Sequence, residues 1–449
     1  SVRMNGDARM YITPSAGDRD KWTFSCWVKR SVISSGSQTL FSAIDPSNNL
    51  TELRFNSDDK IDYYSHDGSS YTGRLNTNRV FRDVAAWYHI VAVWDSANGT
   101  AGNRMRLYIN GVEETSFATD TNPSSGQDSY VGANLPHYVG DKGDAGQYFK
   151  GYMAEVYYCN GQAYAASDFG EFDEDSPTIW KPKDASGLTF GTGGFYLDFE
   201  DSANLGNDAN GGTDLTESGL AATDSSTDTP TNNFATMNPL YKAPDANTFS
   251  EGNCQVVTHS DNYFGSASTI GVASGKYYFE VEFDSGASIG MAGITSDPQA
   301  DAQGDKHLGK LIDSYGIYGS SGNFLGPSDG SASYGSAISD GEIVGVYMDL
   351  DNNKIYFSVD GSLVSATGKT IVAPASTANT GLYFFGVGDG SSGSVTMKCN
   401  FGGCSAFTVS SGNTDDNGYG NFEYSPNITG DGSAKKFYAL NSSNLSEYG

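Results

Sequence analysis

The sequence predicts an all-β protein with two antiparallel β-sandwich (jelly-roll) domains, an extended linker between them and an extended C-terminal tail. Three observations predict this class. Apolar and polar residues alternate over short stretches, no stretch of a dozen residues keeps a helical period, and Gly accounts for 56 of 449 residues. Short alternating runs separated by Gly-rich turns are typical of sandwiches and jelly rolls.

In the first half of the chain, short strands follow one another without a helix. Turn dipeptides such as Asn110-Gly111 and Asn160-Gly161 separate them, and such dipeptides favour tight hairpins. The predicted strands are 22–28, 53–55, 61–64, 87–94, 105–109 and 152–159.

The second half repeats this pattern. Alternation in 276–283 places Tyr278, Glu280 and Glu282 on one face, which we expect to meet solvent, and the intervening apolar residues in a core. The predicted strands are 276–283, 288–295, 315–318, 343–350, 354–359, 382–387 and 394–401.

The distribution of charge predicts the domain boundaries. Residues 1–183 have a net charge of −6 and residues 184–449 one of −22. No Lys or Arg lies between Lys183 and Lys242, where polar residues and Gly dominate, as in linkers. We therefore expect the first domain at 1–200, a linker at 201–234, the second domain at 235–405 and a tail at 406–449. Because the polar stretches 201–233 and 410–449 are long for idle loops, we expect one or both to pack on the chain's own domains or on neighbouring subunits.

Composition excludes several classes of function. A net charge of −28 opposes binding to a phosphate backbone, so no nucleic-acid partner is expected. The longest apolar run is 90–94, which is far from the roughly 20 residues that cross a bilayer, so no membrane insertion is expected. The chain opens with Ser1-Val2-Arg3 and no signal peptide, which favours synthesis in a cytoplasm.

The five cysteines do not form a disulfide framework, because their number is odd and they are scattered. Cys26 and Cys159 lie in predicted strands, where a free Cys behaves as a small buried apolar residue. Cys399 and Cys404 are close enough in sequence to pair, and two unpaired thiols are the alternative.

The two halves resemble two known domain families. The first half resembles a concanavalin A-like, laminin-G-type lectin domain over about 1–200, through 22–28, 87–94, 105–111 and 151–156. The second half resembles a SPRY domain over about 235–405, through 275–283, 341–350, 354–361 and 382–401. The resemblance implies a lectin-like sandwich followed by a SPRY-type sandwich.

The combination resembles virion structural proteins of marine bacteriophages, including cyanophages. Four segments resemble that group, with Cys26 where it often has Gly: 22–30, 194–199, 229–239 and 437–445. This resemblance implies a surface-exposed fibre or tail protein, made in the host cytoplasm and carried on the virion surface. It also implies other virion proteins as partners, a homo-oligomer, and attachment to a host surface glycan or receptor.

No catalytic residues are predicted, and the protein is expected not to be an enzyme. Retaining glycanases on a concanavalin-type fold need two carboxylates close together on one strand face. Glu171, Asp173 and Asp175 alternate, but Ser176 stands where a further glutamate would be needed, so a solvated acidic loop is expected. Glu280 and Glu282 are explained by the solvent face of their strand.

No cofactor and no metal ligand are predicted either. The five histidines do not occur at metal or triad spacing. Asp349-Leu350-Asp351 begins like a calcium loop, but Lys354 and Asp360 stand where Gly and Glu are required, which predicts a hairpin turn. A surface calcium ion stays an open alternative, without a ligand set that the sequence names.

The candidate ligand-binding residues lie around one loop of the first domain. They are Tyr63, Tyr64, His66, Asp67 and Tyr71, which combine aromatic rings for the apolar face of a sugar with a carboxylate for its hydroxyl groups.

Two further places were considered beside this loop. The segment Asp141–Gln147, with His137 and Tyr138 before it, is a second aromatic and polar cluster in the first domain. In the second domain, 297–310 and 315–324 correspond to loops that carry partner recognition in SPRY domains. Ordinary solvated loops or subunit contacts explain the first loop and each of these two places at least as well as a glycan site does.

Three functions follow, in order of preference. The first is a virion surface protein that attaches to the host by non-catalytic binding. The second is a capsid decoration or stabilising protein with the same domains and no receptor role. The third is a glycan-degrading enzyme, for which no pair of carboxylates is found.

Overall fold

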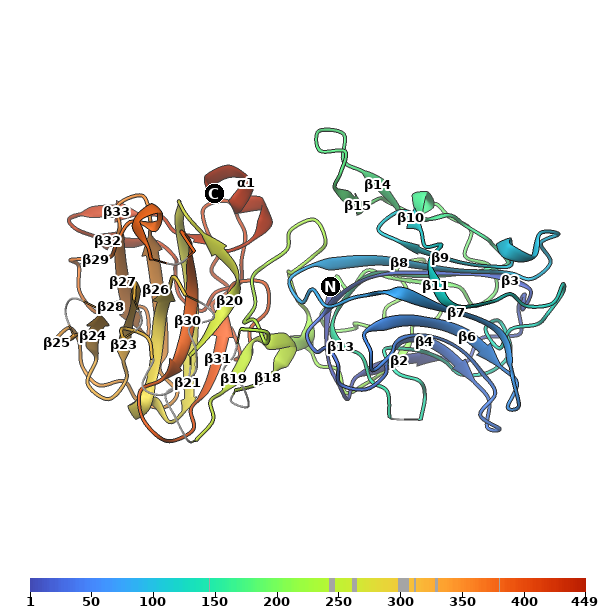
Figure 1. Ribbon diagram of the computed structural model, residues 1–449, viewed down its shortest axis with the longest axis horizontal. Coiled ribbons are helices and arrows are strands. Elements are labelled where there is room, and N and C mark those ends of the chain that lie inside the picture. Colours follow the sequence, from blue (N-terminus) through green and yellow to red (C-terminus); the bar gives the residue numbers. More distant parts are fainter. Residues whose placement is uncertain are drawn as a thin grey trace. The chain divides into compact units, whose positions relative to one another are not determined.

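The computed structural model describes residues 1–144, 146–241, 247–260, 265–297, 307–310, 312–327, 330–378 and 380–449. Contacts divide the chain into two units, Ser1–Thr231 and Asn232–Gly449. Each unit has two large, mainly antiparallel sheets around an apolar core (Figure 1). Among the described residues the one α-helix is α1, Ser442–Tyr448. The prediction of an all-β fold with two sandwiches is confirmed.

The first sheet of the N-terminal unit has seven strands. Their bounds are β1 (Val2–Asn5), β3 (Lys21–Arg30), β8 (Trp87–Asp95), β9 (Met105–Ile109), β10 (Val112–Glu113), β13 (Lys150–Asn160) and β16 (Phe195–Leu197). The order across the sheet is β1, β13, β3, β8, β9 and β10, with β16 also paired to β13.

The second sheet of this unit has eight strands and is termed the eight-stranded sheet. Their bounds are β2 (Arg9–Ile12), β4 (Gln38–Ile44), β5 (Leu50–Phe55), β6 (Lys60–His66), β7 (Tyr71–Val80), β11 (Phe117–Thr121), β12 (His137–Val139) and β17 (Thr216–Ser218). The order is β11, β7, β6, β5, β4, β12, β2 and β17. A separate hairpin consists of β14 (Gly170–Phe172) and β15 (Trp180–Pro182).

Aromatic side chains join the two sheets of the N-terminal unit. Trp22 and Phe24, alternate residues of β3, are almost completely buried in the core. The ring of Phe24 stacks on Phe41 of the opposite sheet with 4.3 Å between ring centres, and Trp22 meets Tyr63 of that sheet edge-on at 5.8 Å. Each such buried ring stabilises the fold by about 1.5–3 kcal/mol.

The polar stretch after residue 200 belongs to the N-terminal unit, which corrects the predicted linker at 201–234 and the domain end at 200. Its strand β17 pairs with β2, and the buried Asp228 accepts hydrogen bonds from Lys29 Nζ at 2.7 Å and Trp87 Nε1 at 3.1 Å. The polar composition misled the prediction because two carboxylates of this stretch, those of Asp224 and Asp228, neutralise the buried Arg3 and Lys29.

The C-terminal unit has a nine-stranded and a six-stranded sheet. The nine-stranded sheet contains β18 (Thr248–Ser250), β19 (Gln255–Val257), β21 (Lys276–Ser285), β26 (Ile343–Asp349), β27 (Lys354–Val359), β28 (Ser362–Leu363), β29 (Lys369–Thr370), β31 (Thr396–Asn400) and β34 (Tyr438–Ala439). The six-stranded sheet contains β20 (Gly265–Val272), β22 (Gly290–Thr295), β23 (Ser314–Tyr318), β24 (Asn323–Gly326), β25 (Gly330–Ala332) and β30 (Tyr383–Asp389). A small hairpin consists of β32 (Ile428–Gly430) and β33 (Ser433–Lys435).

Every strand predicted from alternation overlaps an observed strand. The predicted hairpin turn is also present, between β26 and β27. Several observed strands have no predicted counterpart, among them β4 and β7. In β4 a register shift between Thr39 and Phe41 breaks the alternation, and β7 is mostly polar. All five cysteines are buried, and no disulfide links Cys399 to Cys404.

The tail packs on the C-terminal unit. Strand β34 pairs in parallel with β21, and Asp415 of the tail accepts a hydrogen bond from the Ala439 backbone at 3.0 Å. The face of β21 that was expected to meet solvent is therefore covered, and Tyr278 and Glu280 are fully buried. Glu282, nearer the end of β21, pairs with Lys398 at 3.6 Å.

Glu280 joins the tail to the sheet through four hydrogen bonds. Its carboxylate accepts from the backbone N–H groups of Tyr424 (2.7 Å) and Glu423 (3.0 Å), from Tyr278 Oη (2.8 Å) and from Asn400 Nδ2 (3.1 Å). Burial raises the pKa of Glu280 to about 7, although the four donors oppose this rise. The carboxyl group thus titrates near neutral pH.

The stability of the C-terminal unit is expected to depend on pH through this group. Since the pKa of Glu280 is about 7 in the folded state and 4.5 unperturbed, the folded state binds the proton more tightly. The stability it contributes is complete below pH 4.5 and is lost as pH rises through 7. The unfolding free energy of the parent minus that of Glu280→Gln measures this contribution. As the pH rises from 4.5 to 7, this difference should fall by about 3 kcal/mol. Urea titrations across this range measure it, and a difference that grows with pH would contradict the assignment.

Candidate functional site

One row of side chains crosses the outer face of the eight-stranded sheet, the face that points away from the core. Strand pairing places its residues opposite one another in turn: Thr121, Arg74, Tyr64, Glu52, Ser42, Tyr138, Tyr11 and Thr216. At about 4.8 Å between neighbouring strands, the row spans roughly 34 Å. This row, with the side chains that contact it, is termed the outer row.

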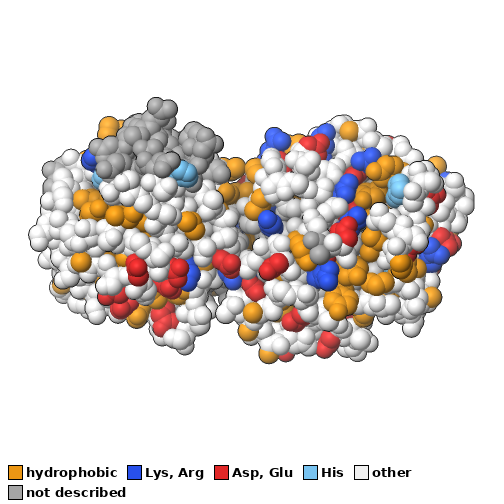
Figure 2. Space-filling model, turned by 90° about the horizontal axis from the view of Figure 1, so that it is seen from below, with side chains coloured by type: hydrophobic (Ala, Val, Ile, Leu, Met, Phe, Trp, Pro, Cys, Tyr) orange, Lys and Arg blue, Asp and Glu red, His pale blue; other side chains and the backbone are white. Residues whose placement is uncertain are grey.

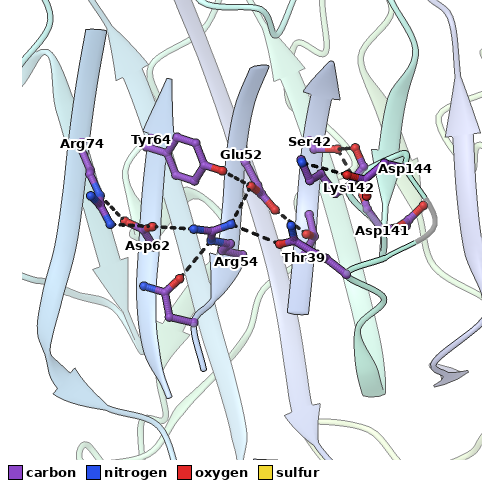
Figure 3. Close-up of polar contacts among 12 residues, drawn as sticks. Thr39, Ser42, Glu52, Arg54, Asp62, Tyr64, Arg74, Asp141, Lys142 and Asp144 are labelled. Carbon is purple, nitrogen blue, oxygen red and sulfur yellow. Dashed lines mark hydrogen bonds and ion pairs between the residues drawn. The ribbon is translucent and has the colours of Figure 1, made fainter. Parts of the chain in front are cut away.

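Two arginines of the outer row share one buried carboxylate (Figure 3). Asp62 accepts from Arg74 Nε at 2.8 Å, from Arg74 Nη2 at 3.1 Å and from Arg54 Nη2 at 3.2 Å. Arg54 Nη1 also donates to Glu52 at 3.4 Å. The side chains of Asp62 and Glu52 are 0% exposed, whereas Arg54 is 16% and Arg74 25% exposed. The carboxylates therefore lie beneath the guanidinium groups.

Hydroxyl donors surround Glu52 on its other sides. Thr39 Oγ1 and Tyr64 Oη both donate to its carboxylate, and the Arg54 guanidinium lies 4.9 Å from the Tyr64 ring centre. Burial raises the pKa of Glu52, against the lowering effect of Arg54 and of the two hydroxyl donors. The hydrogen bond to Asp62 raises the pKa of Arg74, which keeps that guanidinium charged.

The segment after β12 packs along the same face. Ser42 Oγ donates to the carbonyls of Asp141 and Lys142, at 3.1 and 3.0 Å, and Arg54 Nη1 donates to Gln147 Oε1 at 3.2 Å. Lys142 Nζ pairs with Asp144 at 2.8 Å. The predicted second cluster thus joins the outer row.

A pocket of about 360 Å³ lies beside Tyr138. It combines one aromatic ring, two prolines, an amide and two carboxylates, from the turn between β4 and β5, from β12 and from the segment after β12. Its lining residues are Ile44, Asp45, Pro46, Asn48, Pro136, Tyr138, Gly143 and Asp144. A ring that offers apolar contact beside hydrogen-bonding groups suits a small polar ligand such as a sugar.

Arg9 stands between the two tyrosines at this end of the row. Its guanidinium carbon lies 5.5 Å from the ring centre of Tyr138 and 5.8 Å from that of Tyr11, and Nη1 donates to the buried Asp141 at 2.9 Å. Figure 2 shows Lys and Arg side chains beside hydrophobic side chains on this face of the N-terminal unit, with Asp and Glu side chains among them. The face therefore presents cations and rings together.

The structure separates one predicted ligand residue from the others. Tyr63 is 0% exposed and packs edge-on against Trp22 in the core, with 5.8 Å between ring centres. Its inclusion in the candidate site was wrong, because alternation along β6 sends Tyr63 inward and Tyr64 outward.

The other four predicted residues lie at one end of the outer row or in the loop beside it. Tyr71 is 44% exposed and meets Tyr64 edge-on at 5.3 Å and His66 at 5.1 Å. Tyr64 is only 5% exposed, so it supports the face from below. Hydrogen bonds from Ser70 and Ser69 lower the pKa of Asp67 to about 2. The carboxylate of Asp67 is thus occupied by its own turn.

The second predicted cluster, around His137 and Tyr138, also has one residue in the core and one at the surface. His137 is 1% exposed, and its Nε2 accepts from the Gly132 backbone at 3.0 Å. Burial lowers the pKa of His137 to about 4. His137 thus belongs to the core, whereas its neighbour Tyr138 lines the pocket.

The acidic run after β14 is a loop of the small hairpin. Asp173 accepts from Lys181 Nζ at 3.0 Å, and this hydrogen bond lowers the pKa of Asp173. Lys181 also lies 3.9 Å from Glu171. Within the described ranges, no group of three or more His, Cys, Asp or Glu residues could hold a metal ion. No helix in the described part of the chain has the length and apolar character to cross a membrane.

Comparison with known families agrees with this division of the chain. Residues 5–166 match the model of the concanavalin A-like lectin/glucanases superfamily, and residues 276–400 match that of the SPRY domain. The chain carries a concanavalin A-like domain followed by a SPRY domain. No curated protein matches the chain. The two units are therefore termed the concanavalin A-like unit and the SPRY unit.

Several solved structures match parts of the chain at low identity. The SPRY domain of human HERC1 is 16% identical, covers 38% of this chain and 99% of its own, and has a TM-score of 0.29. A putative carbohydrate binding protein from Bacteroides ovatus is 14% identical, covers 49% of this chain and 58% of its own, and has a TM-score of 0.33. A third match is domain 4 of an extracellular arabinanase from Geobacillus stearothermophilus, in complex with arabinotriose. It is 20% identical, covers 37% of this chain and 72% of its own, and has a TM-score of 0.28.

The sequence analysis did not identify the charged residues of the outer row, nor Tyr11 beside Tyr138. Glu52 and Arg54 alternate on β5, and Asp62 and Tyr64 alternate on β6, so each pair shares a face. Charged residues at alternate positions of a strand were the available signal. The pairing of β2 with β12, which brings Tyr11 to Tyr138, left no signal in the sequence.

Loss of Asp62 is expected to destabilise the concanavalin A-like unit. Asp62→Asn leaves Arg54 and Arg74 without the carboxylate that neutralises them, and breaking such a buried pair lowers the unfolding free energy by about 3 kcal/mol. Asp58→Asn is the matched control, because its partner Lys60 pairs with it on the surface, where a change within about 0.5 kcal/mol is expected. Thermal and urea unfolding measure both; equal effects would show that the shared carboxylate is not needed.

Proposed function

We propose that the protein is a non-catalytic glycan-binding protein of a virion surface, which holds a host surface glycan on the outer face of the eight-stranded sheet. One observation carries the proposal: within a concanavalin A-like domain, exposed rings and ordered hydrogen-bonding groups share one continuous face with a pocket. The phage and host-attachment parts of the proposal are supported by the resemblance of the four segments to virion structural proteins.

The contacts of the pocket suit a sugar ring. Tyr138 packs against Tyr11 with 5.7 Å between ring centres and a tilt of 33°, so its orientation is held before a ligand arrives. The ring and the prolines Pro46 and Pro136 offer apolar contact, while Asn48 and Asp144 offer hydrogen-bonding groups. Little side-chain freedom is lost on binding, which favours affinity.

The carboxylates of this face support binding without cleavage. Hydrolysis of a glycosidic bond needs a carboxylic acid that reaches the leaving oxygen and a second carboxylate nearby. Glu52 and Asp62 are adjacent on β5 and β6, but both are 0% exposed and covered by arginines. Asp173 of the exposed hairpin is held by Lys181.

The acidity of the chain fits a protein displayed in many copies. A net charge of −28 makes free subunits repel one another, so assembly into a homo-oligomer with other virion proteins requires specific contacts. The SPRY unit supplies a second surface for such partners.

Removal of the exposed rings is expected to weaken glycan binding. Tyr71→Ala and Tyr138→Ala should each reduce affinity for the bound polysaccharide about tenfold, because each ring supplies roughly 1.4 kcal/mol of contact. Phe172→Ala is the matched control, since Phe172 is 47% exposed against 44% for Tyr71 but lies on the separate hairpin. Binding to immobilised host-surface polysaccharides and adsorption to host cells measure the effect.

Two results would overturn this proposal. One is equal binding by the parent and both tyrosine variants. The other is release of reducing sugar by the purified protein that is lost in Glu52→Gln or Asp62→Asn, which would make the protein an enzyme.

A further inference from the structure

We propose that the glycan is a linear polysaccharide that carries carboxylates, a uronic acid polymer, and that the arginines of the outer row bind these carboxylates. This inference rests on the proposed function and names the class of its ligand. Three observations support the inference: the arginines of the outer row face outward, two of them have unused N–H donors, and they are spaced across the sheet.

Where arginines pair with carboxylates on this face, the outward charges are the cations, whereas Asp144 beside the pocket is itself 46% exposed. Arg9 and Arg74 are each 25% exposed and Arg54 is 16% exposed, while their partners Asp141, Asp62 and Glu52 are all 0% exposed. Each ion pair is thus oriented with its positive end toward the surface. At these three arginines, a ligand meets N–H donors before it meets a carboxylate.

Two of these arginines keep donors for a ligand. Arg74 uses Nε and Nη2 on Asp62, and Arg9 uses Nη1 on Asp141. Among the described residues, no hydrogen bond engages Nη1 of Arg74 or Nη2 of Arg9, so these groups are the donors left for a ligand. The carboxylate beneath each guanidinium holds it in one orientation, so binding a second carboxylate costs little side-chain entropy.

The spacing of the arginines fits a polymer. Arg74 lies on β7 and Arg54 on β5, two strands apart, and Arg9 lies on β2, three strands further. At about 4.8 Å per strand, Arg74 and Arg9, the two with unused donors, stand roughly 24 Å apart across the sheet, with Arg54 between them. A single small anion contacts one of these positions. A chain with repeated carboxylates contacts several.

The charge of the whole chain narrows the class of anion. At −28, the protein repels a densely charged polymer such as a nucleic acid at long range. A uronic acid polymer is less densely charged, and its planar carboxylate matches the guanidinium fork. Asp45 and Asp144 line the pocket at the other side of Tyr138, where they can accept hydrogen bonds from neutral hydroxyl groups. The polymer would therefore place hydroxyl-rich sugar atoms at the pocket and carboxylates at the arginines.

The test compares each acidic polymer with its own neutral form. Alginate, polygalacturonate and hyaluronate are immobilised beside their carboxyl-reduced products, with neutral glucans and galactans as a further set. The full chain should bind at least one acidic polymer about tenfold more tightly than its reduced product. Arg74→Gln should abolish this preference, and Arg74→Lys should restore only part of it, because Lys keeps the charge without the fork.

Arg106→Gln is the matched control. Arg106 is half-buried on β9 of the other sheet and its loss changes the net charge equally, so binding should stay within about twofold of the parent. Thermal unfolding of each variant verifies that it is folded.

Three results would overturn the inference, and they can be told apart. Equal or tighter binding of the neutral forms refutes the uronic acid class but leaves glycan binding standing. Unchanged acid preference in Arg74→Gln refutes the role of the outer row. Failure to bind every polymer, acidic and neutral, refutes the proposed function as well.

Discussion

The carboxylate of Asp62, buried beneath two guanidinium groups, is the interaction on which the outer face of the concanavalin A-like unit depends. It accepts three N–H groups from Arg54 and Arg74 and thereby sets the direction of both side chains. A buried ion pair of this kind repays its desolvation only when the geometry is complete, so its value lies in specificity more than in stability. The same carboxylate that makes the face rigid also turns its positive charge outward.

Much of the fold could be predicted from the sequence, because burial of one strand face imposes a period of two. The prediction failed where that period is broken, as at the register shift of β4, or where both faces are polar, as in β7. It also failed to see that the second face of β21 is covered. Nothing local to Glu280 indicates that Glu423 and Tyr424, more than 140 residues later, bring their N–H groups to it.

The candidate site could be predicted only in part for the same reason. The rings of Tyr64 and Tyr71 were recognisable as a cluster, and alternation alone would have excluded Tyr63. Arg54 and Glu52 were visible as charges within a strand. The partnership of Arg9, Tyr11 and Tyr138 depends on pairing of β2 with β12, and long-range pairing leaves no periodic trace in one sequence.

The two ends of the SPRY unit are tied to each other, and this has a mechanical consequence. Phe234 and Asn441 form an antiparallel bridge, with hydrogen bonds from Ala235 N to Leu440 O and from Ser442 N to Asn233 O. In an antiparallel bridge the entering and leaving ends lie on the same side. A force that pulls the two ends apart therefore breaks these hydrogen bonds one after another, in a peeling geometry. It does not load them all at once, as a shear geometry would. Under tension the terminal bridge would open first and the sheets later, so the tail would act as an extensible segment before the sandwich yields.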